Sequence, residues 1–468
     1  MKTVHLMRFI TNIAMSLFVC ACAHRAPTQL DLRGFDEIQS DFGASSGISI
    51  SDEPLNAWWT PIDEGCLTVL VNLTLDQNRN LESAAATKRS LDATARLRHA
   101  DKLPFFTPSS SFTRTFSQGG HTTSGLMDLG ASWEVDLFGR LNLIESGAVR
   151  DAQSREWLLR DITVSLIGET VSAYIEYITA VEGLSLAQQN LEIQTTTLEH
   201  TMRRLQEEVG SKLEATQALQ QVRSTEALLP ALESSNTRAA ARLSIATSTR
   251  IDQVLEHCEY PQSLAELNIP SSEDIPIGNI DGLIRRHPSI RAAQASALSA
   301  GVNVEIAKLA AFPRIQIVAS GSHQVTGASV SFLGVGPRLI WPGLNPQNVS
   351  AQNAVAREEL NAAIASFEGS VLETLAEVES SLQFVANAEA ELSSWREAET
   401  AAKEATRLAR RRYEEGLSGF INLLDAERRL LDASQSRLSA QSNLLSAYIQ
   451  LQLGLGVGWQ DPRSAASI

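Results

Sequence analysis

Two kinds of hydrophobic pattern alternate along this chain of 468 residues. In the segment 127–137, apolar residues at odd positions alternate with polar or small residues at even positions, which predicts a strand with one apolar and one polar face. The apolar set is Met127, Leu129, Ala131, Trp133, Val135 and Leu137. A spacing of four and three residues, typical of packed helices, relates Val371, Leu375, Val378, Leu382 and Val385. The chain is therefore predicted to combine strands with long helices.

The helices are expected to be very long. No proline occurs from Gly139 to Leu229 or from Gln347 to Asp461. A helix over 140–206 would be about 100 Å long at 1.5 Å per residue, so it must pack against other helices. Shorter helices are expected near 74–102 and 212–247, and Pro230 should bend or interrupt the second of them.

The order of elements occurs twice, with an offset of about 208 residues, as expected for an internal duplication. Leu103-Pro104 corresponds to Phe312-Pro313, and Arg204-Leu205-Gln206-Glu207 corresponds to Arg412-Tyr413-Glu414-Glu415. The apolar positions from Val371 to Val385 correspond in the first half to Val164, Gly168, Val171, Ile175 and Ile178. Gly168 is the weak member of that set, and we interpret it as the mark of a close helix contact.

These patterns predict a mixed α+β fold with the following organisation. A signal peptide (1–21) and a tether (22–57) precede the first repeat (58–257), which has strands at about 106–138 and a helical hairpin at about 140–247. A linker (258–276) leads to the second repeat (277–459), with strands at about 314–341 and a hairpin at about 347–455. A short tail (460–468) ends the chain.

The N-terminus has the features of a bacterial export signal. Lys2 and Arg8 precede a short apolar stretch, and Val19-Cys20-Ala21-Cys22 resembles a lipobox with Cys22 as the acylated cysteine. An ordinary cleaved signal is the alternative. Removal of Lys2 and Arg8 changes the net charge from −15 to −17, which argues against nucleic acid as a partner.

Two cysteines remain after Cys22, namely Cys66 and Cys258. Because an exported chain is oxidised, they are a possible disulfide pair, and two buried free thiols are the alternative.

The strands require partners from other chains. No stretch of the mature sequence has the roughly 20 continuous apolar residues of a transmembrane helix, so a membrane crossing would have to use a β-barrel. Four strands cannot close a barrel, whereas three chains would contribute twelve. Trp133 and Trp341 lie where an interfacial aromatic belt is expected. A soluble four-stranded sheet is the alternative reading of the same pattern.

Several motifs resemble those of one family in the expected order. They are Trp133-Glu134-Val135-Asp136-Leu137-Phe138-Gly139-Arg140, Ile284-Arg285-Arg286-His287-Pro288-Ser289-Ile290, Arg412-Tyr413-Glu414-Glu415-Gly416-Leu417, Leu423-Leu424-Asp425-Ala426-Glu427-Arg428 and Leu453-Gly454-Leu455-Gly456-Val457-Gly458-Trp459. Together they resemble TolC-like outer membrane efflux lipoproteins from about residue 58 to 459.

The resemblance implies a trimeric outer-membrane β-barrel of twelve strands, continued by a periplasmic α-helical coiled-coil tunnel. It implies an exit duct of a tripartite efflux system of a Gram-negative bacterium, anchored by lipid at Cys22. The implied partners are two further copies of the chain, a periplasmic adaptor protein, an inner-membrane proton-driven transporter and outer-membrane lipid. No cofactor is implied.

The resemblance also implies a gate near the second hairpin tip. Asp425 takes the position of a ring of inward carboxylates, Ile421 that of an apolar ring, and Arg428 could pair with Asp425 of a neighbouring chain. Asn422 stands where a second aspartate sometimes occurs. Without the family, Asp425 and Arg428 would be interpreted as an ordinary surface pair three residues apart.

Both hairpin tips are acidic and are candidates for the adaptor contact, with solvated turns as the alternative. The first tip is Glu207, Glu208, Val209 and Gly210, and the second is Glu414, Glu415, Gly416 and Leu417. Glu208 stands where the family has a turn glycine, so Gly210 is expected to supply the turn instead.

The sequence offers little support for an enzyme. The eight histidines contain no pair at the spacing of a helical metal site, and neither a phosphate-binding loop nor a Gly-x-Ser-x-Gly motif occurs. A non-conducting periplasmic scaffold built from the same coiled coils is the alternative to the efflux duct, although a scaffold would not need an apolar strand face.

Overall fold

The computed structural model describes residues 57–63, 65–250, 252–253, 260–269, 275, 280–326, 328–341 and 344–459. The predicted signal peptide, Cys22, most of the tether, Cys258 and the tail lie outside the described residues. Among the helices of the described part, none has the length and apolar character needed to cross a membrane.

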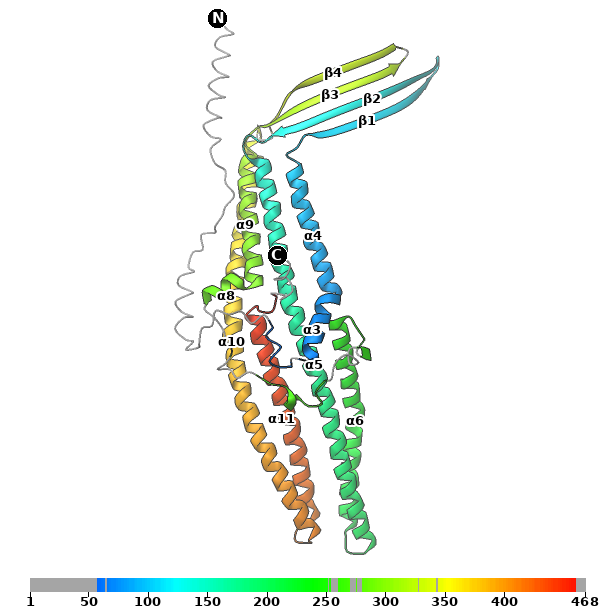
Figure 1. Cartoon of the computed structure of the whole chain (residues 1–468), viewed down its shortest axis with the longest axis vertical. Coiled ribbons are helices and arrows are strands. Elements are labelled where there is room, and N and C mark those ends of the chain that lie inside the picture. The colour runs from blue at the N-terminus through cyan, green and yellow to red at the C-terminus, as the bar shows by residue number, and fades with distance from the viewer. Residues whose placement is uncertain are drawn as a thin grey trace. The chain divides into compact units, whose positions relative to one another are not determined.

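The described elements follow the order α3 (Cys66–Gln77), α4 (Arg79–Ala100), β1 (Phe105–Ser117), β2 (Gly120–Val135), α5 (Arg140–Gln206), α6 (Lys212–Thr247), η1 (Leu264–Glu266), α8 (Ile280–Arg286), α9 (Pro288–Leu309), β3 (Arg314–Thr326), β4 (Ala328–Ile340), α10 (Pro346–Glu414) and α11 (Phe420–Gly454). Figure 1 labels them along the chain. The long helix expected over 140–206 is α5, and its counterpart in the second half is α10.

Two compact units divide these elements, and each contains corresponding parts of both sequence repeats. The first unit contains residues 85–158 and 289–370, which include all four strands. The second contains the described residues of 57–84, 159–288 and 371–459, which include both hairpin tips. The duplicated halves are therefore not separate compact bodies.

The helix predicted near 74–102 is divided at Asn78 into α3 and α4. Asn78 has an extended backbone, with φ −66° and ψ 123°. Its side-chain Oδ1 accepts hydrogen bonds from the backbone N–H groups of Asn80 (2.9 Å) and Leu81 (3.2 Å). The asparagine therefore caps the start of α4, which is the physical reason why one predicted helix is two.

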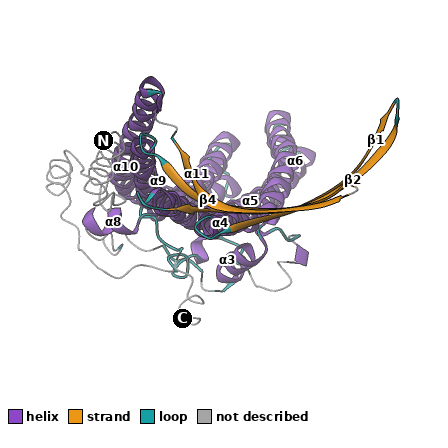
Figure 2. Cartoon of the chain, turned by 90° about the horizontal axis from the view of Figure 1, so that it is seen from above, coloured by secondary structure: helices purple, strands orange, loops and turns teal. Residues whose placement is uncertain are grey.

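The first unit contains one antiparallel sheet with the order β1-β2-β3-β4. Figure 2, seen from above, shows that the sheet is curved. The register pairs Leu129 with Pro108 on one side and with Gly321 on the other, and Gly321 pairs with Leu333. Within one chain, β1 and β4 each have a neighbour on one side only.

One face of this sheet is apolar across all four strands. Directly paired residues share a face, and the register extends the predicted face of β2 to odd positions of β3 and β4 and to even positions of β1. Its exposed members are Phe106, Phe112, Phe116, Met127, Leu129, Trp133, Ile317, Val325, Leu333, Val335 and Leu339. Phe105 and Phe332 are exposed apolar residues of the opposite face. The alternation predicted from β2 is thus a property of the whole sheet.

The segment after β2 explains the motif at 133–140. Asp136 accepts hydrogen bonds through its carboxylate from the backbone N–H groups of Leu141 and Asn142, both at 3.0 Å, and so caps α5. Gly139 has φ +76°, a conformation that a side chain disfavours. Arg140 donates two hydrogen bonds to one oxygen of Glu134, at 2.8 and 3.0 Å, and a third to the other at 2.8 Å. The motif is therefore a compact strand-to-helix turn.

The two tryptophans predicted at the sheet end occupy corresponding positions. The Trp133 indole N–H donates to the carbonyl of Lys102 at 2.8 Å, and that of Trp341 donates to the carbonyl of Ala311 at 3.1 Å. Both rings are partly exposed, at 39% and 46%. Each tryptophan therefore links the end of a strand, β2 or β4, to the segment that enters the preceding strand, β1 or β3.

Helices α5 and α9 pack together below the strands within the first unit. Leu143, Val302 and Leu309 are buried there, and the rings of Phe138 and Phe312 have centroids 5.0 Å apart. Asp151 accepts a hydrogen bond from the Ser299 hydroxyl at 2.6 Å. This packing holds α5, which follows β2, against α9, which precedes β3.

The second unit has its core around the N-terminal described segment. Trp58 is fully buried, and the Tyr448 hydroxyl of α11 donates to its backbone carbonyl at 3.2 Å. The Tyr174 hydroxyl of α5 donates to Asp63 at 2.6 Å. Residues 57–63 are therefore part of the helical core.

Close helix packing in the second unit agrees with one sequence prediction and changes another. A Cβ on Gly168 would lie 2.5 Å from Cδ2 of Leu453 in α11, so this glycine does mark a close helix contact. Pro230 lies inside α6, which continues from Lys212 to Thr247, so the predicted break does not occur, and the predicted bend stays a prediction.

Candidate functional site

The two hairpin tips belong to the second unit, where α5 turns into α6 and α10 turns into α11. Glu207, Glu208 and Val209 are exposed in the first tip, and Glu414, Glu415, Gly416 and Leu417 are exposed in the second. Ser211 accepts a hydrogen bond from the backbone N–H of Leu213 at 3.0 Å and caps α6. In a single chain the acidic side chains of both tips are therefore exposed to solvent and available to another protein.

The turn residue of the first tip differs from the prediction. Glu208 has φ +59°, whereas Gly210 is absent from the positive-φ residues of the described chain. The expectation that Gly210 would supply the turn was therefore wrong. A Cβ at Gly210 would lie 2.9 Å from Cβ of Arg204, so this glycine is needed for close approach and not for a left-handed backbone. In the second tip the left-handed position is Gly416, at φ +71°.

Replacing Glu208 by glycine is expected to stabilise the first tip by about 1 kcal/mol, because a residue with a side chain is strained in the left-handed conformation. The melting temperature of the purified protein measures this gain. Glu207→Gly, which removes the neighbouring carboxylate from the end of the turn, is the matched control. No gain over that control would show that the turn is unstrained.

A cleft of about 550 Å³ lies between the two tips. The residues that line it are Thr196, Thr197, His200, Arg204, Glu207, Val209, Arg410, Tyr413, Glu414, Glu415, Gly416 and Leu423. The cleft thus combines apolar groups with three carboxylates from the tips and two arginines, Arg204 and Arg410. Such a surface can receive an apolar side chain while its carboxylates contact cations.

The predicted gate residues lie together on one face of α11. Ile421 is 57% exposed, and Asn422, Asp425 and Arg428 are exposed as well. Asp425 accepts a hydrogen bond from Arg429 at 2.8 Å. Arg428 donates to the side chain of Gln221 in α6 at 2.7 Å. Within the chain, Asp425 and Arg428 therefore contact Arg429 and Gln221 and do not form the surface pair with each other that the sequence offered as an alternative.

Other contacts join the two hairpins near the tips, and sequence reasoning missed them. The Arg204 guanidinium lies over the Tyr413 ring, 4.9 Å from its centroid. Glu427 is buried, and it accepts hydrogen bonds from Thr197 of α5 at 3.2 Å and from Arg410 of α10 at 3.1 Å. Burial raises the pKa of Glu427, although the bonds from Arg410 and Thr197 act in the opposite direction.

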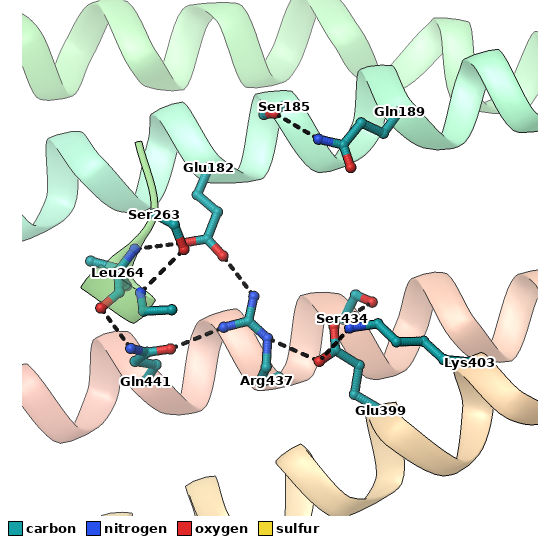
Figure 3. Close-up of polar contacts among 11 residues, drawn as sticks. Glu182, Ser185, Gln189, Ser263, Leu264, Glu399, Lys403, Ser434, Arg437 and Gln441 are labelled. Atoms are coloured by element: carbon teal, nitrogen blue, oxygen red, sulfur yellow. Dashed lines mark hydrogen bonds and ion pairs between the residues drawn. The ribbon is translucent and has the colours of Figure 1, made fainter. Parts of the chain in front are cut away.

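A larger buried network lies further along the same helices (Figure 3). Arg437 of α11 donates to Glu182 of α5 at 2.6 Å and lies 3.4 Å from a carboxylate oxygen of Glu399 of α10. The three side chains are 12%, 8% and 11% exposed. Burial acts to raise the pKa of Glu399, but hydrogen bonds from Lys403 and Ser434 and the charge of Arg437 hold it below its ordinary value.

The linker between the repeats is part of this network (Figure 3). Glu182 accepts hydrogen bonds from the Ser263 hydroxyl at 3.0 Å and from the backbone N–H of Leu264 at 2.7 Å. Gln441 of α11 donates to the Leu264 carbonyl at 2.7 Å. Nothing in a single sequence separates these charged residues from ordinary surface positions, because their partners are 81 to 255 residues away.

The predicted cysteine pair is only partly visible. Cys66 is disulfide-bonded and buried at the start of α3. Cys258, the partner suggested by the sequence, lies outside the described residues, so this pairing stays a prediction.

An exposed apolar sheet face, paired long helices and acidic hairpin tips define an outer-membrane channel protein. The family model of the outer membrane efflux protein matches residues 70–248 and 279–457. The chain belongs to this family of outer membrane efflux proteins.

Relatives and solved structures agree over nearly the whole chain. The chain is 26% identical to the pyoverdine export outer membrane protein OpmQ of Pseudomonas putida, covering 97% of this chain and 98% of OpmQ. It is 25% identical to the solvent efflux pump outer membrane protein SrpC of Pseudomonas putida, covering 84% and 85%. The structure of the outer-membrane channel OprN matches with a TM-score of 0.78 and 27% identity, covering 94% and 99%.

Proposed function

We propose that three copies of this chain close a twelve-stranded barrel in the outer membrane and form the exit duct of a tripartite efflux system. The observation that carries the proposal is the sheet with an apolar face across all four strands and two edges unpaired within the chain. Lipid offers no hydrogen bonds to a sheet edge, so β1 and β4 need partners there. The next copy of the chain supplies them.

The aromatic residues support the same membrane placement. Phe112 and Phe116 lie near the β1–β2 turn and are 79% and 74% exposed, whereas Trp133 and Trp341 lie at the opposite end of the sheet. Aromatic girdles at both borders of the apolar band are typical of outer-membrane barrels. In this arrangement the polar face lines the water-filled interior.

We assign the hairpin tips to contact with a periplasmic adaptor, which links the duct to an inner-membrane proton-driven transporter. The cleft between the tips combines three carboxylates with two arginines and with apolar side chains. Because the carboxylates outnumber the arginines, this chemistry suits a helical partner that presents basic residues around an apolar one. Acylation of Cys22 would hold the N-terminus at the outer membrane.

The gate is assigned to the exposed face of α11 that carries Ile421, Asn422, Asp425 and Arg428. With three copies around an axis, Asp425 would form a ring of carboxylates, and their mutual repulsion favours bound cations. In the single chain Asp425 is 61% exposed as a side chain, which leaves it available to neighbouring copies.

Ion conduction by the full-length protein tests the proposal. The protein, extracted in detergent and incorporated into planar lipid bilayers, is expected to be a trimer that conducts ions in discrete steps. A water-soluble, non-conducting protein after Cys22→Ala would support the alternative of a periplasmic scaffold.

A further inference from the structure

We propose that Arg437 is a positioning residue for the gate. It fixes the rotation of α11 about its own axis and so determines the direction in which Ile421, Asp425 and Arg428 face. The inference rests on the proposed function, because it assigns a role relative to the gate on α11. Arg437 lies about two and a half to four and a half helical turns from the gate residues and does not touch them.

The gate residues and the residues that attach α11 to its neighbours lie on opposite sides of α11. At 3.6 residues per turn, Glu427, Ser434, Arg437 and Gln441 fall within an arc of about 80°. The gate residues Ile421, Asp425 and Arg428 fall on an arc centred roughly 160° away. The first group is buried or hydrogen-bonded to α5 and α10, whereas the second group is exposed and has one contact with another helix, from Arg428 to Gln221 of α6. A rotation of the anchored face therefore turns the gate face by the same angle.

The contacts of Arg437 are directional. The guanidinium is planar, and its separate N–H groups reach Glu182 of α5 at 2.6 Å, Gln441 of its own helix at 2.9 Å, and Glu399 of α10 at 3.4 Å. Two flanking helices thus hold one side chain of α11 from two directions, as Figure 3 shows. Such fork-like contacts require one orientation, whereas apolar contacts tolerate rotation.

The two carboxylate partners of Arg437 have further contacts outside α11. Glu182 receives hydrogen bonds from Ser263 and Leu264 of the inter-repeat linker. Glu399 is paired with Lys403 of its own helix α10 at 3.1 Å, and it also accepts a hydrogen bond from Ser434, a second residue of α11, at 2.9 Å. A rotation of α11 would therefore strain both the Arg437 and the Ser434 contacts, so the network resists rotation.

A second attachment lies closer to the gate. Glu427 also bridges α5 and α10, through Thr197 and Arg410, about 15 Å from Arg437 along the helix. Its arginine partner is 40% exposed, whereas the Arg437 side chain is 12% exposed. The network at Arg437 is therefore the more enclosed of the two and is the one that we assign as the fixed point.

The test measures the open probability of single channels formed by the full-length protein in planar bilayers. Arg437→Gln is expected to raise the open probability by about tenfold, because α11 no longer has a single rotational setting. Combined with Asp425→Ala and Arg428→Ala, it should add little further, because all three changes act on the same gate. A residue important only for stability would reduce the number of channels but leave the open probability of each unchanged.

The matched control is Arg242→Gln. Arg242 of α6 pairs with Glu176 of α5 at 2.6 Å, but the two side chains are 52% and 48% exposed. The same substitution therefore removes an inter-helix ion pair of similar length in a solvated setting, and the open probability should stay at the wild-type value.

Glu182→Gln covers the case in which Arg437→Gln does not assemble. The amide oxygen can still accept hydrogen bonds from Ser263 and Leu264, and the amide NH2 group then faces Arg437, so the contacts with the linker remain while the charge and the hydrogen bond to Arg437 are both lost. A raised open probability supports the inference. The inference is overturned if Arg437→Gln and Glu182→Gln both keep the wild-type open probability while the double variant Asp425→Ala with Arg428→Ala opens the channel. In that case the proposed function still stands. Absence of conduction by the wild-type protein would contradict the proposed function itself.

Discussion

Replacing Asp425 and Arg428 together by alanine is expected to raise the open probability of the channel by roughly tenfold to a hundredfold. The change removes the carboxylate assigned to the axis and the hydrogen bond from Arg428 to Gln221, which joins the second hairpin to the first. Contacts of charged groups contribute about 1.5 to 3 kcal/mol, and a loss of that size shifts a two-state equilibrium by this factor. Single-channel recording in planar bilayers measures the result.

Two further variants separate the parts of this effect. Gln221→Ala should reproduce the contribution of Arg428→Ala if the contact within the chain holds the gate. Arg223→Ala is the control, because Arg223 lies on the same helix and pairs with Glu226 in an exposed position. An unchanged open probability in the double variant would place the closure elsewhere in the tunnel.

The second large effect is a loss of stability in acid, caused by His287. This residue is buried where α8 meets α9, and burial lowers its pKa to about 4, with the charge of Arg286 acting in the same direction and a hydrogen bond to the Leu453 backbone opposing it. The folded state therefore keeps His287 neutral, while the unfolded chain takes up a proton below about pH 6.5. About 3 kcal/mol of stability should be lost as the pH falls from 6.5 to 4.

The melting temperature at several pH values measures this loss. His287→Gln removes the titrating group but can still donate a hydrogen bond, so its melting temperature should fall less between pH 6.5 and 4 than that of the wild type. His200→Gln, which changes an exposed histidine of α5, should behave as the wild type does. Parallel curves for the wild type and His287→Gln would contradict the assignment.

The close packing of Gly456 against His287 is a contact that the sequence alone does not predict. Gly456 has φ +62°, and a Cβ there would lie 2.5 Å from Cδ2 of His287. The two residues belong to separate motifs, at 284–290 and 453–459. Each motif is recognisable alone, but their contact depends on the fold of the whole chain.

The sequence predicted the elements that depend on local periodicity. The alternation at 127–137 predicted a strand with an apolar face, and the structure extends that face to four strands through their register. The long helix over 140–206 was expected from the absence of proline and is α5. Local chemistry also misled in three places. Pro230 does not interrupt α6. Asn78 caps a new helix, and Glu208 takes the left-handed position that was assigned to Gly210.

The buried polar contacts between the two hairpins could not be predicted, because they join residues far apart in the chain. Arg437 and Glu182 are separated by 255 positions, and in the sequence both resemble solvated helix residues. The same holds for Glu427, whose partner Thr197 is 230 positions away. Family resemblance pointed to the exposed face of α11, whereas the opposite face, which anchors the helix, became visible only in three dimensions.

The claim that the chains share one barrel can be tested by cross-linking strand edges in membranes. A cysteine at Ser109 of β1, on the polar face, is combined with single cysteines at positions 334 to 340 of β4. If the chains share one barrel, covalent dimers and trimers are expected, and only from cysteines at even positions of β4, which share the face of Ser109. No product larger than a trimer is expected. Absence of any link between chains at every position, in protein that is folded and membrane-bound, would contradict the shared barrel.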